Sequence, residues 1–501
     1  MSLNILISSF SADDYTRFIY FLTKKNKRKD VKNIQLFKLL YANKYSSEEI
    51  CKKLYPNKKK DAYHALRKRL YDSLIDFTAA LNLEEENNEK IQVIKYILVG
   101  RSFIQQQYFS YGLKLLNKAE HIAKEYQLYP YLNEIYHIKI QFAHAFDELD
   151  LEATICKFKE YQQLYLAEEE LTIVYAKIRE NLLQKHYLGE QVNFQNIVKR
   201  ITVEQNISID ETLSFKSLYQ LITITSISAF VTKDYLEIEA FMMNTYSLLN
   251  KHANKERERF YHIQVLYMIA NTMFRNKKFM RSLYFLDLME AELFANRKKY
   301  FTRFQLKYEL LHALNLNYNG KSEAAIKKLE PLVKKKHEDL ESALDIHLSL
   351  IVFYAQQNEV KKAYKLLNDL NHTDKWYIEK VGKEWVIKKN LMEILLLIEL
   401  DYYEVFENRL SGFRRKYTSF LKEINQERVL VFLRYAKLYY ETPKEIVSKA
   451  FHDEVESNFV WVGAKREDIF VMSFYAWLKS KMTNKPIYEV TLELISQAQQ
   501  L

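Results

Sequence analysis

The sequence is poor in the residues that build tight turns and covalent cross-links. Its 501 residues include only 7 glycines, 5 prolines and 2 cysteines. Two-residue hairpins and phosphate-binding loops depend on glycine, so this composition argues against all-β and Rossmann-type α/β folds. No two glycines lie within ten residues of each other. A Walker loop or a dinucleotide-binding fingerprint is therefore excluded, and long helices with short connections are favoured.

Other signatures are also missing. Cys51 and Cys156 are far apart and belong to no metal-type spacing, which excludes a disulfide framework and fits a reducing compartment. There is no G-x-S-x-G elbow and no C-x-x-C pair. The first residues lack the features of a signal peptide, and no uninterrupted apolar run is long enough to span a membrane. We therefore expect a soluble, cytoplasmic protein that binds no membrane.

Positive charge is concentrated at one end of the chain. Residues 1–80 contain 17 Lys and Arg against 8 Asp and Glu, a net charge of +9 out of +11 for the whole protein. The other 421 residues contain 58 against 56 and are nearly neutral. Such a local positive field attracts phosphate groups or an acidic partner. The pattern predicts a basic module joined to a long body with a different role.

The first 85 residues predict a small module of four helices. Ser46 and Glu49 have the spacing of a capping box, which predicts a short helix that Pro56 ends. A long helix should follow from about residue 59 to 83, because large apolar residues recur there every three or four positions. These residues are Tyr63, Leu66, Leu70, Leu74, Phe77 and Leu81. A short helix, a turn and a longer basic helix together outline a helix-turn-helix-like unit.

Basic side chains beside that apolar stripe are candidates for contact with nucleic-acid phosphates. The candidate residues are Lys58, Lys59, Lys60, His64, Arg67, Lys68 and Arg69, with the loop 24–29 as a further basic segment. The turn lacks glycine, and no array of Asn, Gln or Arg stands out for reading bases. The favoured interpretation is therefore a solvated basic face or a docking face for an acidic protein, with nucleic-acid binding as the alternative.

Beyond the acidic stretch 84–89 the chain carries a recurring signature. A small residue is followed by a large one four positions later and an apolar one three positions after that. The copies are Gly112-Leu116-Ala119, Ser282-Leu286-Met289, Ala325-Leu329-Leu332, Ala363-Leu367-Leu370 and, without the small residue, Phe406-Leu410-Phe413. The last four are spaced by 43, 38 and 43 residues. A small residue lets two helices approach closely, so the signature predicts repeated helix pairs.

The segment 350–367 resembles the tetratricopeptide repeat (TPR) family, with Tyr354, Ala363 and Leu367 at the aromatic, small and bulky positions. The resemblance implies an all-α, right-handed solenoid of TPR-like helix pairs with a groove that holds a partner peptide. The period is nearer 40 residues than the family's 34. The N-terminal part also resembles a module that precedes such repeats in some bacterial proteins, which implies no activity.

These patterns divide the chain into a basic helical module (1–85), a TPR-like solenoid (86–440) and a C-terminal helical cap (441–501) that covers the last repeat. Residues 189–213 are expected to form an irregular connection. The leading hypothesis is a non-enzymatic adaptor or scaffold that binds a protein or peptide partner. The alternative is a DNA-binding transcriptional regulator whose body senses a peptide or controls oligomer state. No cofactor, metal or catalytic residue is expected; an enzyme would need a metal site within His137–Asp150.

Overall fold

All regular structure in the described part of the chain is helical. The structure is a computed structural model and describes residues 3, 6–7, 10, 12–25, 32–42, 45–56, 60–85, 89–146, 149–188, 213–232, 235–252, 255–256, 258–295, 298, 300–335, 337, 339–424, 426–445, 447–458 and 467–500. These ranges contain 23 α-helices and no β-strand. The predicted all-α class is therefore confirmed. The chain folds as two compact units, Met1–Gln162 and Gln163–Leu501.

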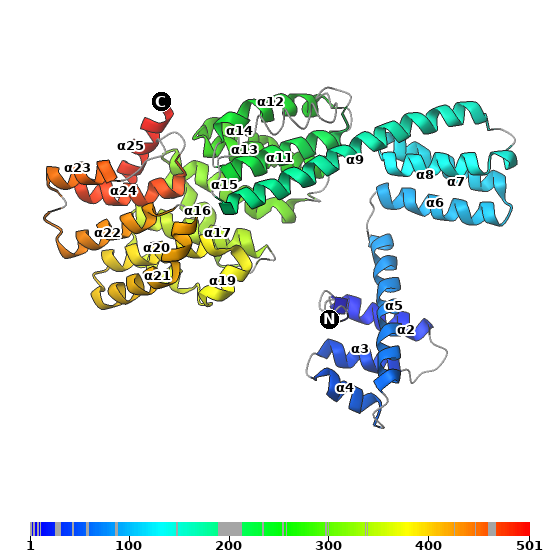
Figure 1. The fold of residues 1–501 in the computed structure, drawn as a ribbon, viewed down its shortest axis with the longest axis horizontal. Helices are drawn as coiled ribbons and strands as arrows, with labels where there is room; N and C mark the ends of the chain where they lie inside the picture. The colour runs from blue at the N-terminus through cyan, green and yellow to red at the C-terminus, as the bar shows by residue number, and fades with distance from the viewer. Residues whose placement is uncertain are drawn as a thin grey trace. The chain divides into compact units, whose positions relative to one another are not determined.

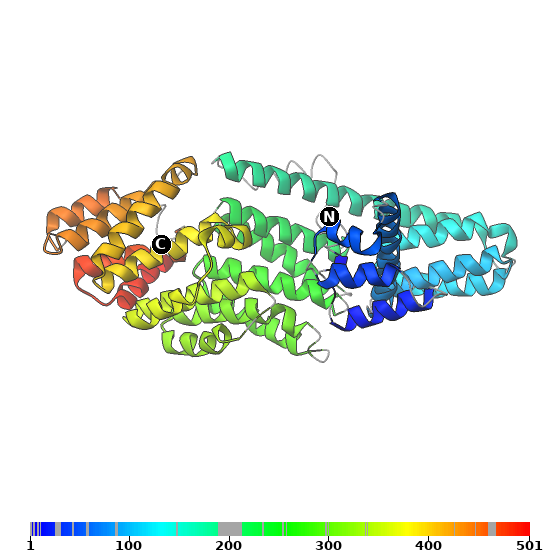
Figure 2. The same cartoon turned by 90° about the horizontal axis from the view of Figure 1, so that it is seen from below.

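The helices of the first unit are α2 (Ala12–Lys25), α3 (Lys32–Ala42), α4 (Ser47–Leu54), α5 (Lys60–Glu85), α6 (Glu89–Gln105), α7 (Phe109–Glu125), α8 (Tyr129–Gln141) and the beginning of α9 (Leu151–Leu188). The second unit holds the rest of α9, followed by α11 (Phe215–Thr232), α12 (Leu236–Lys251), α13 (Arg259–Arg275), α14 (Phe279–Phe294), α15 (Phe301–Tyr318), α16 (Ser322–Val333), α17 (Leu340–Gln356), α18 (Val360–Asn368), α19 (Asp374–Val381), α20 (Lys383–Glu399), α21 (Tyr403–Glu423), α22 (Arg428–Glu441), α23 (Lys449–Asn458), α24 (Ile469–Thr483) and α25 (Ile487–Gln500). Helices adjacent in sequence pack together in pairs in both units (Figures 1 and 2).

The helices α2 to α5 enclose a core of their own. The predicted stripe on α5 is buried: Tyr63, Leu66, Leu70, Leu74 and Phe77 are at most 5% exposed, while the side chain of Leu81 lies outside the described part. Phe77 and Phe37 both pack on Phe18, with ring centroids 5.0 and 4.7 Å away. Apolar burial of this kind is the main source of stability for a small helical module.

The predicted capping box at the start of α4 is confirmed. The amide of Glu49 donates to Ser46 Oγ at 3.3 Å, and the amide of Ser46 donates to Glu49 Oε2 at 2.8 Å. Both bonds satisfy amides that lack partners inside the helix. The same serine hydroxyl contributes to a lowered pKa of Glu49, after the larger effect of the Ser46 backbone bond.

Among the described helices, six pairs turn through the same backbone geometry. One residue in each turn has a positive φ: Gln107 (66°), Gln127 (51°), Lys277 (60°), Gly320 (82°), Asn358 (61°) and Asp401 (58°). In each case the next amide donates to the carbonyl five residues earlier, as in Glu359 N to Tyr354 O at 2.8 Å. This is the Schellman arrangement, which ends a helix and reverses the chain tightly. Equivalent turns recur through both units and give the helix pairs a common construction.

The signature found in the sequence begins five residues after this left-handed residue in each of its five copies. Its first residue is buried in every copy, at Gly112, Ser282, Ala325, Ala363 and Phe406. The signature therefore marks the second helix of the pairs α6–α7, α13–α14, α15–α16, α17–α18 and α20–α21. The predicted helix pairs are confirmed at these places.

The helices α6 and α7 approach each other closely at Gly112. A Cβ atom on Gly112 would lie 2.5 Å from Ile104 Cγ1 and 3.0 Å from the carbonyl oxygen of Gly100. The first distance is too short for a real Cβ contact and the second is tighter than most, so a side chain here would force Ile104 or the helix spacing to shift. The first copy of the signature thus has glycine for a steric reason.

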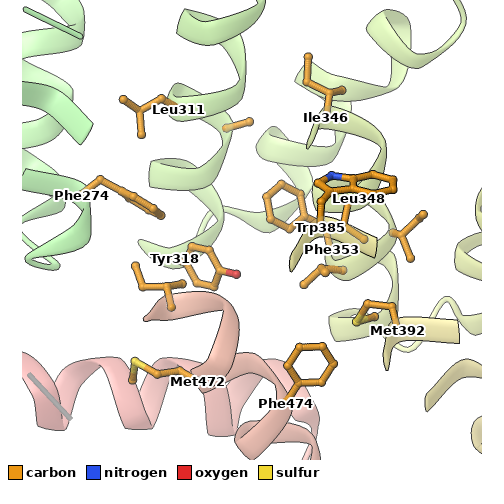
Figure 3. Close-up of a cluster of buried hydrophobic side chains, with 14 of the residues drawn as sticks. Phe274, Leu311, Tyr318, Ile346, Leu348, Phe353, Trp385, Met392, Met472 and Phe474 are labelled. Carbon is orange, nitrogen blue, oxygen red and sulfur yellow. The ribbon is translucent and has the colours of Figure 1, made fainter. Parts of the chain in front are cut away.

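The C-terminal helix α24 crosses the ends of four earlier helices: α13, α15, α17 and α20. From its N-cap Asp468 toward its end, the polar contacts of α24 with these helices include Arg275–Asp468, Tyr318–Ser473 (3.2 Å), Gln356–Ser473 (3.4 Å) and Trp477–Glu399 (2.6 Å). Met472 and Phe474 of α24 face the apolar cluster that contains Tyr318 and Phe353 (Figure 3). One helix is therefore packed against four successive pairs.

The last helix returns across the same elements. After a left-handed turn at Asn484, the hydroxyl of Tyr488 donates to Asn317 O at 2.6 Å. Near the end of α25, the side-chain amide Nε2 of Gln499 donates to Lys277 O at 2.7 Å. We call α24 and α25 (residues 469–500) the C-terminal hairpin. The C-terminal cap was expected to cover the last repeat. The hairpin extends further, because it also contacts α13 and α15.

A buried carboxylate fixes the beginning of this hairpin. Glu467 is 3% exposed and accepts two hydrogen bonds from Arg428 Nη1, both at 2.9 Å. Its carbonyl oxygen accepts from Lys277 Nζ, also at 2.9 Å. Burial lowers the pKa of Lys277 to about 8. Because buried ionic groups are costly unless they are paired, these contacts specify where the hairpin docks.

The boundaries expected after residues 85 and 440 stay predictions. Of the irregular connection expected over residues 189–213, all but Leu213 lies outside the described residues, as do residues 459–466 of the expected C-terminal cap.

Candidate functional site

The structure places most of the predicted basic residues on the exposed side of α5. Lys60, His64, Lys68 and Arg69 are exposed, and the first three follow one another at intervals of four residues on one helix face. Neither Lys60 nor Lys68 forms an ion pair with a described residue. Their charges are available to a ligand. Lys58, Lys59 and the loop residues 26–29 lie outside the described residues.

Arg67 differs from the other candidates. It is half-buried, and its Nη1 donates to the hydroxyl of Tyr63 at 3.3 Å. That hydroxyl also lies 3.3 Å from Ser47 Oγ on α4. Arg67 therefore takes part in the contact between α4 and α5, so its replacement would disturb packing as well as charge.

A pocket of about 590 Å³ lies between α19, α20 and α21. We call it the α21 pocket. It is lined by Asp374, Asn390, Val405, Asn408, Arg409, Gly412, Phe413, Arg415, Lys416 and Tyr417. Val405, Asn408, Gly412 and Arg415 are spaced by three or four residues and therefore form one face of α21. The opposite face, with Phe406 and Leu410, is buried in the core.

Gly412 occupies the middle of that face without a packing reason. A Cβ atom at this position would meet nothing within 4 Å, and the backbone φ is not in the left-handed region. Glycine inside a helix costs about 1 kcal/mol relative to alanine. Its effect here is to leave the surface of α21 open, so that a ligand can approach the helix backbone.

Because Gly412 has free space around it and Gly112 does not, alanine at these two positions should change the free energy of unfolding in opposite directions. Gly412→Ala is expected to raise the free energy of unfolding by about 0.5–1 kcal/mol, because it removes backbone entropy without a clash. Gly112→Ala is expected to lower it by about 1–3 kcal/mol, because its Cβ would overlap Ile104. Urea denaturation of the two variants measures both changes, and changes of equal sign would contradict the account.

A polar network closes one side of the pocket. Asp374, the first residue of α19, accepts hydrogen bonds on Oδ2 from Lys416 (2.8 Å), Tyr417 (3.1 Å) and Asn390 (3.2 Å). Its Oδ1 accepts from Lys389 Nζ at 3.3 Å, and Lys389 is only 7% exposed. The network joins three helices and fixes the amide of Asn390 and the ammonium of Lys416 beside the pocket.

Electrostatics keep this carboxylate ionised. Burial alone would raise the pKa of Asp374, but the hydrogen bond from Lys416 and the charge of Lys389 outweigh it and lower the pKa from 3.8 to about 2. A hydrogen-bonded carboxylate between two ammonium groups is stabilised in its charged form. Asp374 therefore offsets the positive charge of Lys389 and Lys416.

The two histidines in His137–Asp150, the segment where an enzyme would need its metal site, do not share a helix. His137 is exposed on α8, which ends at Gln141, whereas His144 lies in a separate 3₁₀ turn, Ala143–Ala145. Asp147 lies outside the described residues. Over the described ranges, no group of three His, Cys, Asp or Glu side chains is arranged to hold a metal ion.

None of the described helices combines the length and apolar character needed to cross a bilayer.

The comparisons with family models, curated proteins and solved structures gave no match. The pocket residues were not predicted from the sequence. Two features of the sequence mark them: an isolated glycine within a helical pattern, and polar residues at helical spacing on either side of it. Neither feature identifies a ligand without the structure.

Proposed function

We propose that the protein is a non-enzymatic scaffold that binds a peptide segment of a partner protein at the α21 pocket. The observation that carries this proposal is Gly412, whose missing side chain leaves the pocket open at a cost in helix stability. The backbone of a peptide could approach α21 closely at this point. The charged and amide side chains around Gly412 would fix its orientation.

We further propose that the helix pairs form a right-handed, TPR-like solenoid. The six equivalent left-handed turns and the period near 40 residues support this arrangement. The free thiols of Cys51 and Cys156 fit a reducing cytoplasm.

The test is a peptide selection followed by a steric block. Peptides are selected from a random display library on the full-length protein, and their affinities are measured for wild type, Gly412→Leu and Gly412→Ala. Leucine fills the space above α21 and should weaken binding at least tenfold, and alanine, which adds only a methyl group over the backbone, should weaken it less. If Gly412→Leu bound every selected peptide as tightly as wild type, the proposed site would be wrong. Circular dichroism checks that the leucine variant is folded.

A second candidate function is nucleic-acid binding by the basic module. It is favoured by the exposed row Lys60–His64–Lys68, since Lys60 and Lys68 have no ion-pair partner among the described residues. Phosphate contacts by such side chains would make affinity fall steeply with salt. In this function the module would serve a transcriptional regulator, and the helical body would sense a peptide.

Charge reversal separates this function from general electrostatic attraction. The variant Lys60→Glu/Lys68→Glu/Arg69→Glu is compared with Lys361→Glu/Lys365→Glu/Lys422→Glu, which reverses the same number of exposed charges in the second unit. Binding of labelled duplex DNA at two salt concentrations should be lost only in the first variant. Equal losses in both variants would contradict a specific nucleic-acid interface on α5.

A further inference from the structure

The charges around the α21 pocket are unequal. Three lining side chains are cationic, at Arg409, Arg415 and Lys416, against the single carboxylate of Asp374. That carboxylate already accepts from four donors, two of which are lysine ammonium groups. It has no capacity left to attract a cationic ligand. The positive charge of the arginines is what a ligand would meet.

Arg415 is the cation with the fewest constraints. Arg409 is paired with Glu393 at 2.5 Å, and Lys416 is paired with Asp374 at 2.8 Å. Arg415 is exposed, lies one helical turn from Gly412 and forms no ion pair with any described residue. A guanidinium in this setting can accept a carboxylate in a bidentate arrangement.

The other end of the same helix face is apolar. Val405 is 49% exposed and lines the pocket ten residues before Arg415. At 1.5 Å per residue these two positions are about 15 Å apart along α21. An extended chain covers that distance with roughly four to five residues. Between them, the exposed side chain of Asn408 can bond a peptide amide or carbonyl group.

We propose that the α21 pocket binds an extended acidic segment of a partner protein. An aspartate or glutamate of that segment pairs with Arg415. The segment's backbone passes over Gly412 beside Asn408, and an apolar side chain about four residues from the acidic one contacts Val405. This inference rests on the proposed peptide-binding function and adds the chemistry and spacing of the ligand.

The test uses two adjacent arginines. Arg414 is exposed like Arg415 and forms no ion pair among the described residues, but it does not line the pocket. Peptides that lose binding on Gly412→Leu are taken from the selection described above and measured on Arg415→Gln and Arg414→Gln. We expect these peptides to be rich in Asp and Glu. Arg415→Gln should weaken them about tenfold or more, and Arg414→Gln should weaken them less than twofold.

The outcomes separate the inference from the function on which it rests. If Gly412-dependent peptides were neutral or basic, or if both glutamine variants had equal effects, the acidic ligand would be wrong while the pocket remained a peptide site. If no peptide depended on Gly412, the proposed function and the inference would both fail. When the acidic residue of such a peptide is changed to the corresponding amide, Arg415→Gln should no longer weaken its binding more than Arg414→Gln does.

Discussion

Replacing Trp477 with alanine is expected to lower the free energy of unfolding by about 3–5 kcal/mol, the usual cost of removing a large buried aromatic side chain. Trp477 is 3% exposed and packs edge to face on Tyr439, with ring centroids 5.6 Å apart. Its indole nitrogen donates to Glu399 at 2.6 Å. The substitution removes packing in the C-terminal hairpin and the bond to the end of α20. Chemical denaturation of the full-length protein measures the loss.

The same variant tests how far the hairpin stabilises the body. Because α24 contacts the ends of α13, α15, α17 and α20, its loosening should increase amide hydrogen exchange at all four ends. In an ordinary repeat array each pair contacts only its neighbours, and the effect would stay within α22 to α25. If the increase in hydrogen exchange were confined to α22 to α25, the hairpin would not stabilise the ends of the earlier helices.

Trp376→Ala provides the matched control. Trp376 is half-buried in α19, where it stacks on His372 with a centroid distance of 4.0 Å. Its removal should cost less than the removal of Trp477, because it is less buried and ties no distant helices together. Its effect on hydrogen exchange should be confined to α19 and the adjoining turn.

Replacing Asp374 with asparagine is expected to destabilise the protein by about 2–3 kcal/mol at neutral pH. The amide keeps the size of the side chain but leaves the ammonium of Lys389, which is 7% exposed, without its counter-ion. Removing one partner from a largely buried ion pair is costly, because the remaining charge is left desolvated. Glu379→Gln, an exposed change on the same helix, is the control and should alter stability by less than about 0.5 kcal/mol.

The effect of this substitution depends on pH in a defined direction. The pKa of Asp374 is lowered from 3.8 to about 2 in the folded protein. The charged carboxylate therefore stabilises the folded state above about pH 4, and the contribution of about 2 kcal/mol is lost as the pH falls toward 2. The stability difference between wild type and Asp374→Asn should shrink over this range. A difference that stayed constant between pH 7 and 2.5 would contradict the lowered pKa.

The sequence predicted the parts of the fold that depend on local patterns. The apolar stripe of α5, the Ser46 capping box and the buried signature positions each reflect the spacing of residues along one helix. The turns between pairs were not visible, because their left-handed residues are chemically diverse: glutamine, lysine, glycine, asparagine and aspartate all occur there. Hydrogen bonding of the backbone, rather than one residue type, fixes these turns.

Contacts between distant segments could not be predicted from one sequence. The C-terminal hairpin joins residues about two hundred positions apart, such as Lys277 and Gln499, whose partners no local spacing reveals. The α21 pocket has the same origin, because Asp374 and Asn390 reach it from two other helices. The sequence shows Gly412 as an isolated glycine, but only the structure shows that the space beside it is empty and that packing does not require a glycine there.

The most direct measurement is a crystal structure of the full-length protein with a Gly412-dependent peptide bound. We expect an extended peptide on the face of α21 that lines the pocket, with its backbone over Gly412 and a carboxylate on Arg415. A peptide bound instead to the C-terminal hairpin, to α5 or to another helix pair, with the α21 pocket empty, would contradict the central claim.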